Sequence, residues 1–186
     1  MRLHRYPFEL VGTVALLSGQ RLLLRPIHPQ DGEVVQAFVR GLSPRSRYQR
    51  FQNAIRELGP ELLRRAVHVD HRRHVALIAE VFEDGVETEV GAARYVADEL
   101  GNVAEFALVV ADAWQRRGVG SLLLEKLLRV ARSRGVRRLR GDVLHDNEPM
   151  LAFARRHGFR IARDPGDARL LVVSKSLEEA PLAQAA

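Results

Sequence analysis

Two glycines separated by one residue stand at the start of a predicted helix, and their spacing suits phosphate binding. Gly118 and Gly120 follow a buried strand that ends near Val110, and a run of leucines continues directly after them. Glycine lets the backbone approach a ligand closely. The first N–H groups of a helix have no partner within it and lie at the positive end of the helix dipole. The segment therefore predicts an anion site suited to a pyrophosphate.

Two widespread nucleotide-binding loops have a different spacing. A Walker A loop requires G-x-x-x-x-G-K-[ST], and a dinucleotide-binding loop requires G-x-G-x-x-G. No segment matches the first pattern, and the second fails because Leu122, Leu123 and Leu124 follow the glycines. The predicted phosphate site therefore points to another ligand.

The spacing Gln115-x-x-Gly118-x-Gly120 resembles the loop that binds the acyl-CoA pyrophosphate in the GNAT superfamily of N-acetyltransferases. A second signature lies downstream, where a predicted strand over 138–143 precedes Asn147 and a helix that ends at Gly158-Phe159. The resemblance implies acetyl-CoA as the cosubstrate, with strand backbone groups on the pantetheine and turn amides on the pyrophosphate. The residues that it places at the cosubstrate are Val109, Val110, Gln115, Arg116, Arg117, Gly118, Val119, Gly120, Ser121 and Asn147.

Asn147 has two interpretations. In the resemblance it binds the pantetheine arm or positions the chain that does. Capping chemistry alone makes it the N-cap of the following helix, with Pro149 in the first turn and Gly158 at the C-terminal end. Both interpretations can hold together.

Three further segments, 22–27, 42–51 and 70–80, look like the acetyltransferase domain of the bacterial Pat-type protein lysine acetyltransferases. This resemblance implies a protein lysine as the acceptor. In that family a nucleotide-sensing or acyl-CoA synthetase-like domain is often attached. We expect no such domain in a chain of 186 residues.

Direct attack of an amine on a thioester needs a group that removes a proton, because the amine is mostly protonated at neutral pH. Pat-type domains carry their catalytic Glu in an Ala-Glu-x-Ala setting, and the matching residue is Glu105. Without the resemblance, Glu105 is a solvent-facing strand residue. Asp112, Asp142 and Asp146 are alternative bases, although turn or capping chemistry explains each of them better.

The general acid is left unassigned. Many GNAT enzymes place a Tyr four residues before the Gly-Phe pair to protonate the leaving thiolate, and this chain has Ala154 there. Solvent can serve instead, or no acid at all, because a thiolate is a fair leaving group.

Composition excludes several other classes of protein. The chain has no cysteine, which removes disulfides, thiolate metal sites and an acyl-cysteine intermediate. No apolar run approaches the length of a membrane span, and residues 1–7 lack a signal-peptide core, so we expect a cytoplasmic protein. His68, His71 and His74 cross a predicted helix end and strand start, which favours loop histidines, and we expect no metal.

The balance of charge suits an anionic ligand. The formal net charge of +6 comes almost wholly from arginine, since Lys126 and Lys175 are the only lysines. This balance fits CoA or an acidic partner, and it raises nucleic acid as an alternative. Nucleic acid is disfavoured because the basic residues of 126–138 are interleaved with the apolar positions of an amphipathic helix.

The predicted elements form one mixed sheet. Antiparallel strands come first and strand–helix alternation follows, which predicts an α/β (α+β) GNAT fold with a mostly antiparallel central sheet and helices on both faces. We expect a single domain over 12–175, with short extensions at 1–11 and 176–186, the last of them frayed. The expected helices cover 31–42, 43–50, 60–67, 118–134 and 147–157, and the expected strands cover 12–17, 20–24, 75–82, 87–97, 103–110, 138–143, 159–162 and 169–173, with hairpin turns at Ser18-Gly19 and Asp84-Gly85.

Three functions remain open from the sequence. The first is acetyl transfer to a protein lysine, and the second is transfer to a small amine. Arg45, Arg47 and Arg50, which lie in the predicted acceptor groove, would favour an acidic acceptor surface. The third is an acyl-CoA-binding sensor with little turnover, which the missing Tyr supports and Glu105 opposes.

Overall fold

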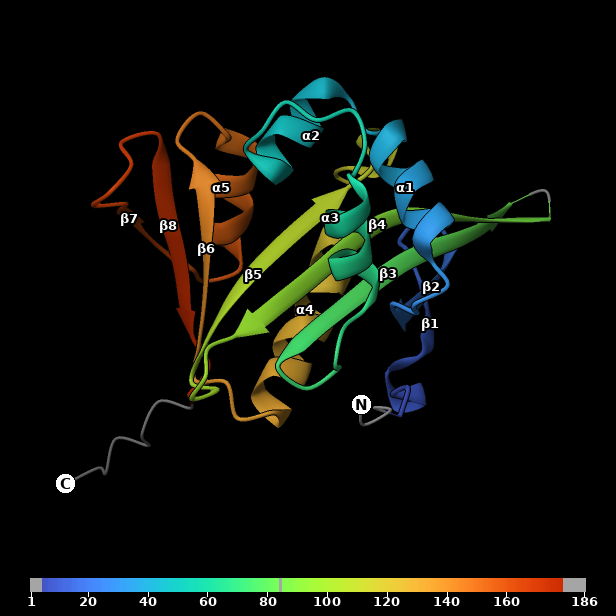
Figure 1. Cartoon of the computed structure of the whole chain (residues 1–186), viewed down its shortest axis with the longest axis horizontal. Coiled ribbons are helices and arrows are strands. Elements are labelled where there is room, and N and C mark those ends of the chain that lie inside the picture. Colours follow the sequence, from blue (N-terminus) through green and yellow to red (C-terminus); the bar gives the residue numbers. More distant parts are fainter. Residues whose placement is uncertain (1–4, 84, 179–186) are drawn as a thin grey trace.

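One twisted sheet runs through the molecule (Figure 1). The computed structural model describes residues 5–83 and 85–178. Within these residues eight strands form the sheet in the order β1-β2-β3-β4-β5-β6-β8-β7. The strands are β1 (Gly12–Ala15), β2 (Arg21–Pro26), β3 (His74–Glu83), β4 (Val86–Ala97), β5 (Val103–Val110), β6 (Arg138–Leu144), β7 (Arg160–Arg163) and β8 (Leu170–Ser176).

Helices cover both faces of this sheet (Figure 1). The helices are α1 (Gly32–Gly41), α2 (Pro44–Phe51), α3 (Pro60–Val67), α4 (Val119–Ser133) and α5 (Glu148–Arg156), with short 3-10 helices η1 (Phe8–Leu10) and η2 (Asp112–Trp114). None of the helices that the structure describes is long and apolar enough to cross a membrane.

Two separate cores hold the layers together. On one face, α4 contributes Leu123, Leu124 and Leu127, spaced at three and four residues so that they share one side of the helix. Residues of α5 join the same core. On the other face, α1 and α3 pack on β3 through residues such as Phe38 and Ile78. The sheet is therefore apolar on both sides over most of its width.

The sheet opens between β5 and β6, which form its only parallel pair among the described strands. Only three residue pairs join them: Val103 with Arg138, Ala104 with Leu139, and Glu105 with Arg140. Beyond Glu105 the two strands diverge, and Figure 1 shows them spreading apart. At the narrow end of this gap, Gly141 lets β6 lie close to Phe106. A Cβ there would lie 2.9 Å from both the carbonyl oxygen and a ring atom of Phe106.

The predicted fold class is confirmed, and the helices and strands agree with the expected ranges to within a few residues at their ends. The Asp84 half of one hairpin turn and most of the C-terminal tail lie outside the described residues. The division into one domain with two extensions stays a prediction. All the same, strands from Gly12 to Ser176 belong to the one sheet.

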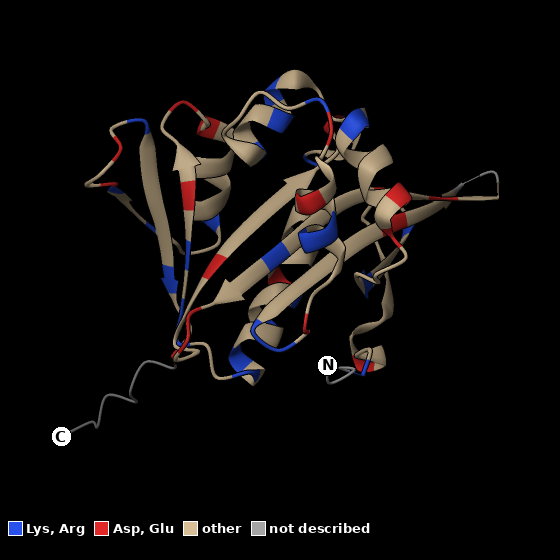
Figure 2. Cartoon of the chain, in the orientation of Figure 1, with Lys and Arg blue, Asp and Glu red and all other residues tan. Residues whose placement is uncertain are grey.

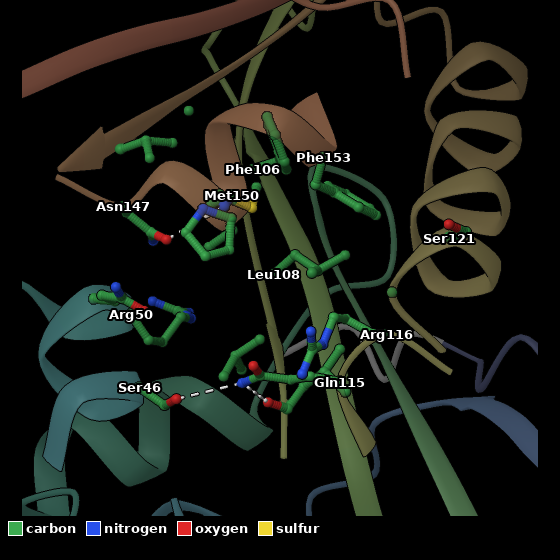
Figure 3. Close-up of a pocket in the computed structure, with 18 of the residues that line it drawn as sticks. Ser46, Arg50, Phe106, Leu108, Gln115, Arg116, Ser121, Asn147, Met150 and Phe153 are labelled. Atoms are coloured by element: carbon green, nitrogen blue, oxygen red, sulfur yellow. Dashed lines mark hydrogen bonds between the residues drawn. The ribbon is translucent and has the colours of Figure 1, made fainter. Parts of the chain in front are cut away.

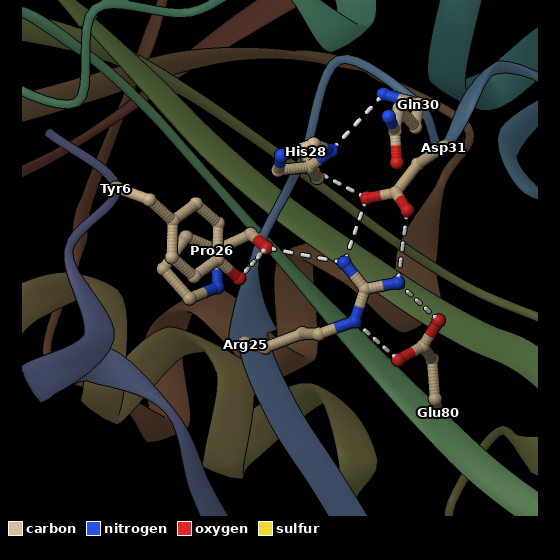
Figure 4. Close-up of polar contacts among 7 residues, drawn as sticks. All are labelled: Tyr6, Arg25, Pro26, His28, Gln30, Asp31 and Glu80. Carbon is tan, nitrogen blue, oxygen red and sulfur yellow. Dashed lines mark hydrogen bonds and ion pairs between the residues drawn. The ribbon is translucent and has the colours of Figure 1, made fainter. Parts of the chain in front are cut away.

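Asp31 stands at the start of the expected helix over 31–42, where a carboxylate commonly caps the first-turn amides. Asp31 occupies the N-cap position, but its side chain makes no cap hydrogen bond. Its carboxylate instead accepts from Arg25 Nη1 at 2.7 Å and from the His28 amide at 2.6 Å (Figure 4). Arg25 Nε also donates to Glu80 at 2.6 Å. The charge-assisted bonds to Arg25 outcompete the helix amides and tie β2, β3 and the start of α1 together.

Candidate active site

A cavity of about 310 Å³ fills the gap between β5 and β6. Its walls come from β5, β6, the turn before α4, the start of α5 and one side of α2. Figure 3 shows Ser46 and Arg50 of α2 across the cavity from Ser121 and Phe153. The cavity therefore joins the predicted phosphate turn to the predicted acceptor groove.

The turn before α4 has the geometry expected of an anion site. Arg116 and Gly118 both adopt left-handed backbone conformations, with φ of 60° and 94°. The helix begins at Val119, and its N-cap, Gly118, makes no side-chain cap hydrogen bond. Because Gly118 has no side chain, the first-turn amides lack an N-cap acceptor from it, and they lie at the positive end of the α4 dipole.

The cosubstrate residues predicted in this turn divide into two groups. Gln115, Arg116, Gly118, Gly120 and Ser121 line the cavity. The side chains of the other two point elsewhere: Val119 is fully buried in the core, and the Arg117 guanidinium lies 5.3 Å from the centre of the Trp114 ring. Only their backbone amides are placed to act in the turn.

Side-chain contacts fix the orientation of two residues in this group. Gln115 Nε2 donates to the Val110 carbonyl oxygen at 3.2 Å and to Ser46 Oγ at 3.4 Å. Ser121 Oγ lies 3.0 Å from His157 Nε2. Sequence reasoning missed His157, because 36 residues separate it from Ser121 and no local pattern links them.

The exposed edge of β5 faces the cavity. The Ala111 amide donates to the Val90 carbonyl, which pairs that end of β5 with β4. Backbone groups alternate along an antiparallel strand, so Val109 turns its N–H and C=O toward β4, whereas Leu108 and Val110 turn theirs toward the gap. Val109 and Val110 line the cavity, and Leu108 joins them, while their predicted contact with the cosubstrate stays a prediction.

Asn147 has its capping interpretation confirmed and also lines the cavity. Its Oδ1 accepts from the Met150 amide at 3.3 Å, which makes it the N-cap of α5. The residue is 8% exposed. The same side chain therefore starts the helix and lies on the wall of the gap, beside Met150 and Phe153 (Figure 3).

Glu105 lies at the apex of the gap. It is the last residue of β5 that pairs with β6, and its side chain is exposed. It is not among the residues that line the cavity, although Ala107, one pleat further along the same side of β5, is. No described residue forms a hydrogen bond or ion pair with the Glu105 carboxylate, so its oxygens are available to a proton.

The alternative carboxylates have other contacts. Asp112 accepts hydrogen bonds from the Ser43 amide, Ser43 Oγ and Ser46 Oγ, at 2.9, 2.7 and 2.8 Å. Partial burial works to raise the pKa of Asp112, but these bonds outweigh it and lower that pKa. Asp142 lines the cavity and forms an ion pair with Arg140 at 3.2 Å. Asp146 is exposed in the turn after β6.

The general-acid position carries no ionisable group. Ala154 is buried in the core on α5. The three tyrosines of the chain lie elsewhere, and none of them lines the cavity. Among the described residues, no tyrosine is therefore placed in the cavity to protonate a leaving thiolate.

The arginines of the acceptor side differ from expectation. Arg45 is exposed and does not line the cavity. Arg47 is used by α1, because its Nη1 donates to the carbonyls of Arg40 and Leu42 at the end of that helix. Only Arg50 of the three expected residues reaches the cavity. Arg94 of β4, which the sequence did not single out, lies close enough to affect the charge of Arg50.

Comparison with known proteins identifies this combination of fold and site. The model of the acetyltransferase (GNAT) family matches residues 43–159. An acetyltransferase of Pseudomonas aeruginosa is 34% identical over 158 residues, which cover 85% of each chain. The chain therefore belongs to the GNAT acetyltransferase family, and it is an enzyme of the acyltransferase class.

Two further comparisons place it near the Pat-type members. The solved GNAT domain of S. lividans PAT superposes with a TM-score of 0.84 at 29% identity, covering 92% of this chain and 99% of that one. Acetyltransferase Pat of Mycolicibacterium smegmatis is 32% identical over 138 residues. This match covers 74% of the chain but only 40% of that relative's length. The resemblance to Pat-type acetyltransferase domains is confirmed.

Proposed function

We propose that this enzyme transfers an acetyl group from acetyl-CoA directly to an amine, and that the amine is a lysine side chain of a protein. The observation that carries the proposal is the cavity in the β5–β6 gap. An uncapped helix start lies at one end of this cavity, and Glu105 lies where the two strands begin to diverge. The similarity to Pat-type domains supports a lysine acceptor. The cytoplasmic location expected from the sequence stays part of this proposal.

Each end of the cavity has a separate task in the proposed reaction. Turn amides and the positive end of α4 receive the pyrophosphate, with Arg116 adding positive charge. The backbone groups of Leu108 and the amide of Val110, which face the gap, receive the pantetheine by strand-like hydrogen bonds. Asn147 contacts the same arm from the start of α5. This arrangement would direct the thioester toward Glu105.

The chemical step breaks the thioester C–S bond and forms an amide C–N bond. Glu105, acting through water, takes a proton from the acceptor ammonium so that the nitrogen lone pair can attack the carbonyl carbon. A water relay is favoured because Glu105 lies one pleat from the nearest cavity-lining residue on its side of β5. The CoA thiolate leaves and takes a proton from solvent, and the new amide nitrogen loses its second proton to solvent.

Changing Glu105 to Gln tests this role. Glutamine keeps the size and the hydrogen-bonding capacity but removes the basicity. We expect Glu105→Gln to bind acetyl-CoA normally and to lose about 10²- to 10⁴-fold in kcat at neutral pH, the usual share of general-base catalysis. The loss should shrink at high pH, where the free amine is already present. Steady-state kinetics with a lysine peptide and calorimetry with acetyl-CoA measure the two effects.

The matched control is Asp142→Asn, which neutralises the other carboxylate in reach of the gap. Near-normal turnover of Glu105→Gln combined with a large loss in Asp142→Asn would transfer the role to Asp142. Binding of acetyl-CoA without turnover on any amine would instead favour the sensor function.

A further inference from the structure

Two positively charged arginines repel each other on the acceptor side of the gap. Arg50 comes from α2 and lines the cavity, and Arg94 comes from β4. Both side chains are half-buried. Burial and the repulsion of Arg94, partly offset by Glu105, lower the pKa of Arg50 to about 10. Burial also lowers the pKa of Arg94. Both groups are cations at neutral pH and lie partly out of water, and Arg94 pairs in register with Ala107 of β5, which lines the cavity.

These two guanidinium groups have almost no hydrogen-bond partners. Each guanidinium offers five N–H donors. Within residues 5–83 and 85–178, Arg50 makes neither a hydrogen bond nor an ion pair, and its guanidinium carbon lies 4.9 Å from the centre of the Phe51 ring. Arg94 makes one hydrogen bond, from Nη2 to the Ala66 carbonyl at 3.0 Å. By contrast, Arg25 is engaged by two carboxylates.

The charges around Glu105 do not balance without a ligand. Figure 2 shows basic and acidic segments on β4, β5 and β6. Arg140 is already paired with Asp142, and Glu89 attracts Arg94 without forming an ion pair with it. Glu105 is then the remaining carboxylate whose charge acts on Arg50, and it must stay free to take a proton. Partly buried cations are favourable only when an anion with hydrogen-bonding capacity is supplied.

In the proposed binding mode, the phosphates of acetyl-CoA do not supply the anion that these two arginines need. They are assigned to the turn at Gly118, whereas Arg50 enters the cavity from α2, across from Ser121 (Figure 3). An acceptor lysine alone would add a third cation and be repelled. The missing negative charge must therefore arrive with the acceptor.

We propose that the acceptor is a lysine with an acidic side chain next to it, and that Arg50 and Arg94 bind that neighbouring carboxylate. This inference rests on the proposed function and names its substrate more closely. A guanidinium holds a carboxylate by two parallel hydrogen bonds, which fixes direction as well as distance. The pair would also lower the pKa of the lysine, because nearby positive charge disfavours its ammonium form.

Two peptides that differ only in charge test the proposal. One carries the sequence Glu-Lys-Glu and the other Gln-Lys-Gln in the same neutral context. We expect the wild type to prefer the acidic peptide by about tenfold or more in kcat/KM, the size of one charge-assisted hydrogen bond. Arg50→Gln should remove this preference through the peptide KM and leave the KM for acetyl-CoA unchanged.

Matched variants separate the loss of the proposed carboxylate-binding site from a general effect of changing charge on α2. Arg45→Gln removes an exposed arginine from the same helix and should keep the full preference. Arg50→Lys keeps the charge without the fork and should restore part of it. Arg94→Gln should act as Arg50→Gln does, and if it fails to fold the Arg50 series decides. Equal rates on both peptides, or a preference that survives Arg50→Gln, would overturn the proposal.

Other outcomes distinguish failure of this proposal from failure of the proposed function. A rise in the KM for acetyl-CoA in Arg50→Gln would overturn the proposal by assigning Arg50 to the cosubstrate. Transfer to free amino acids but to neither peptide would overturn it as well, while leaving acetyl transfer intact. The absence of transfer to every amine, with acetyl-CoA bound, would overturn the proposed function itself.

Discussion

Gly118 combines two properties that the proposed phosphate-binding turn needs. Its φ of 94° suits glycine, and the nearest atom to a Cβ built there is Leu16 Cδ2 at 3.8 Å. A side chain would therefore fit sterically, at the cost of an unfavourable backbone conformation. Asparagine and aspartate tolerate left-handed conformations better than other residues with a side chain. The two differ mainly in charge.

This pair of substitutions isolates electrostatics from strain. Gly118→Asp places a carboxylate beside the expected pyrophosphate, whereas Gly118→Asn does not. We expect the Asp variant to bind acetyl-CoA at least about tenfold more weakly than the Asn variant, because like charges would meet at the helix start. Calorimetry on both folded proteins measures the difference. Equal affinities would remove the phosphate from this turn.

Individual residues also differ in whether their roles could be predicted from the sequence. Gly118 and Asn147 could be found because turn conformation and helix capping are local properties. Gly141 and Arg94 could not, because their roles depend on partners from other strands. Gly141 is required by Phe106, which lies 35 positions earlier, and Arg94 matters through Arg50 of α2. No spacing along the chain encodes either contact.

At the scale of elements, hydrogen bonds from residues outside α2 hold this helix in place. Its N-cap Ser43 accepts from the Ser46 amide, and Asp112, beyond the end of β5, accepts from Ser43 and Ser46. Gln115 adds a bond to Ser46. The proposed cosubstrate turn and the proposed acceptor helix are thus connected through one small polar cluster, which is a structural role for the Asp112 carboxylate.

Removing this carboxylate should loosen α2 without stopping the chemistry. We expect Asp112→Ala to lose about 1–2 kcal/mol in the free energy of unfolding, as for a lost helix cap. The KM for a peptide acceptor should rise while kcat falls less than tenfold. Urea denaturation and steady-state kinetics measure these effects. A loss of kcat as large as that of Glu105→Gln would show instead that Asp112 takes part in proton transfer.

The elements themselves were largely predictable, and the reason is physical. Strands and helices of this chain carry clear apolar periods, and Pro60, Ser43 and the glycine turns mark their ends. The use of Asp31 was not predictable, since its carboxylate binds Arg25 of β2, which also binds Glu80 of β3. Tertiary partners overrode local capping at that helix start.

At the scale of the whole molecule, a buried carboxylate makes stability depend on pH. Glu89 is 5% exposed, and burial raises its pKa well above the usual value, with repulsion from Glu80 and Asp31 adding to the effect. Arg94 and Arg25 oppose the shift only in part. The folded state therefore keeps a proton that the unfolded state releases as the pH rises above about 4.5.

Stability should fall as the pH rises from that value through the folded-state pKa of Glu89. We expect Glu89→Gln to be more stable than the wild type at pH 8, by about 1 kcal/mol or more, and nearly equal to it at pH 4. Glu87→Gln, on an exposed part of the same strand, is the matched control and should change little. Thermal unfolding across this pH range would contradict the idea if the Glu89 and Glu87 variants behaved alike.

The divergence of β5 from β6 means that the sheet is interrupted while the core behind it is continuous. Residues from β5, α4, β6 and α5 share that core, so the two parts of the sheet cannot separate freely. Yet the Leu108 and Val110 edge has no partner strand, and apart from the Val110 carbonyl, which Gln115 binds, its polar backbone groups must be hydrated when the cavity is empty. A bound pantetheine would replace that water and complete the sheet. Release of product is then also a rehydration step, in which solvent must enter the gap before the next cosubstrate can bind.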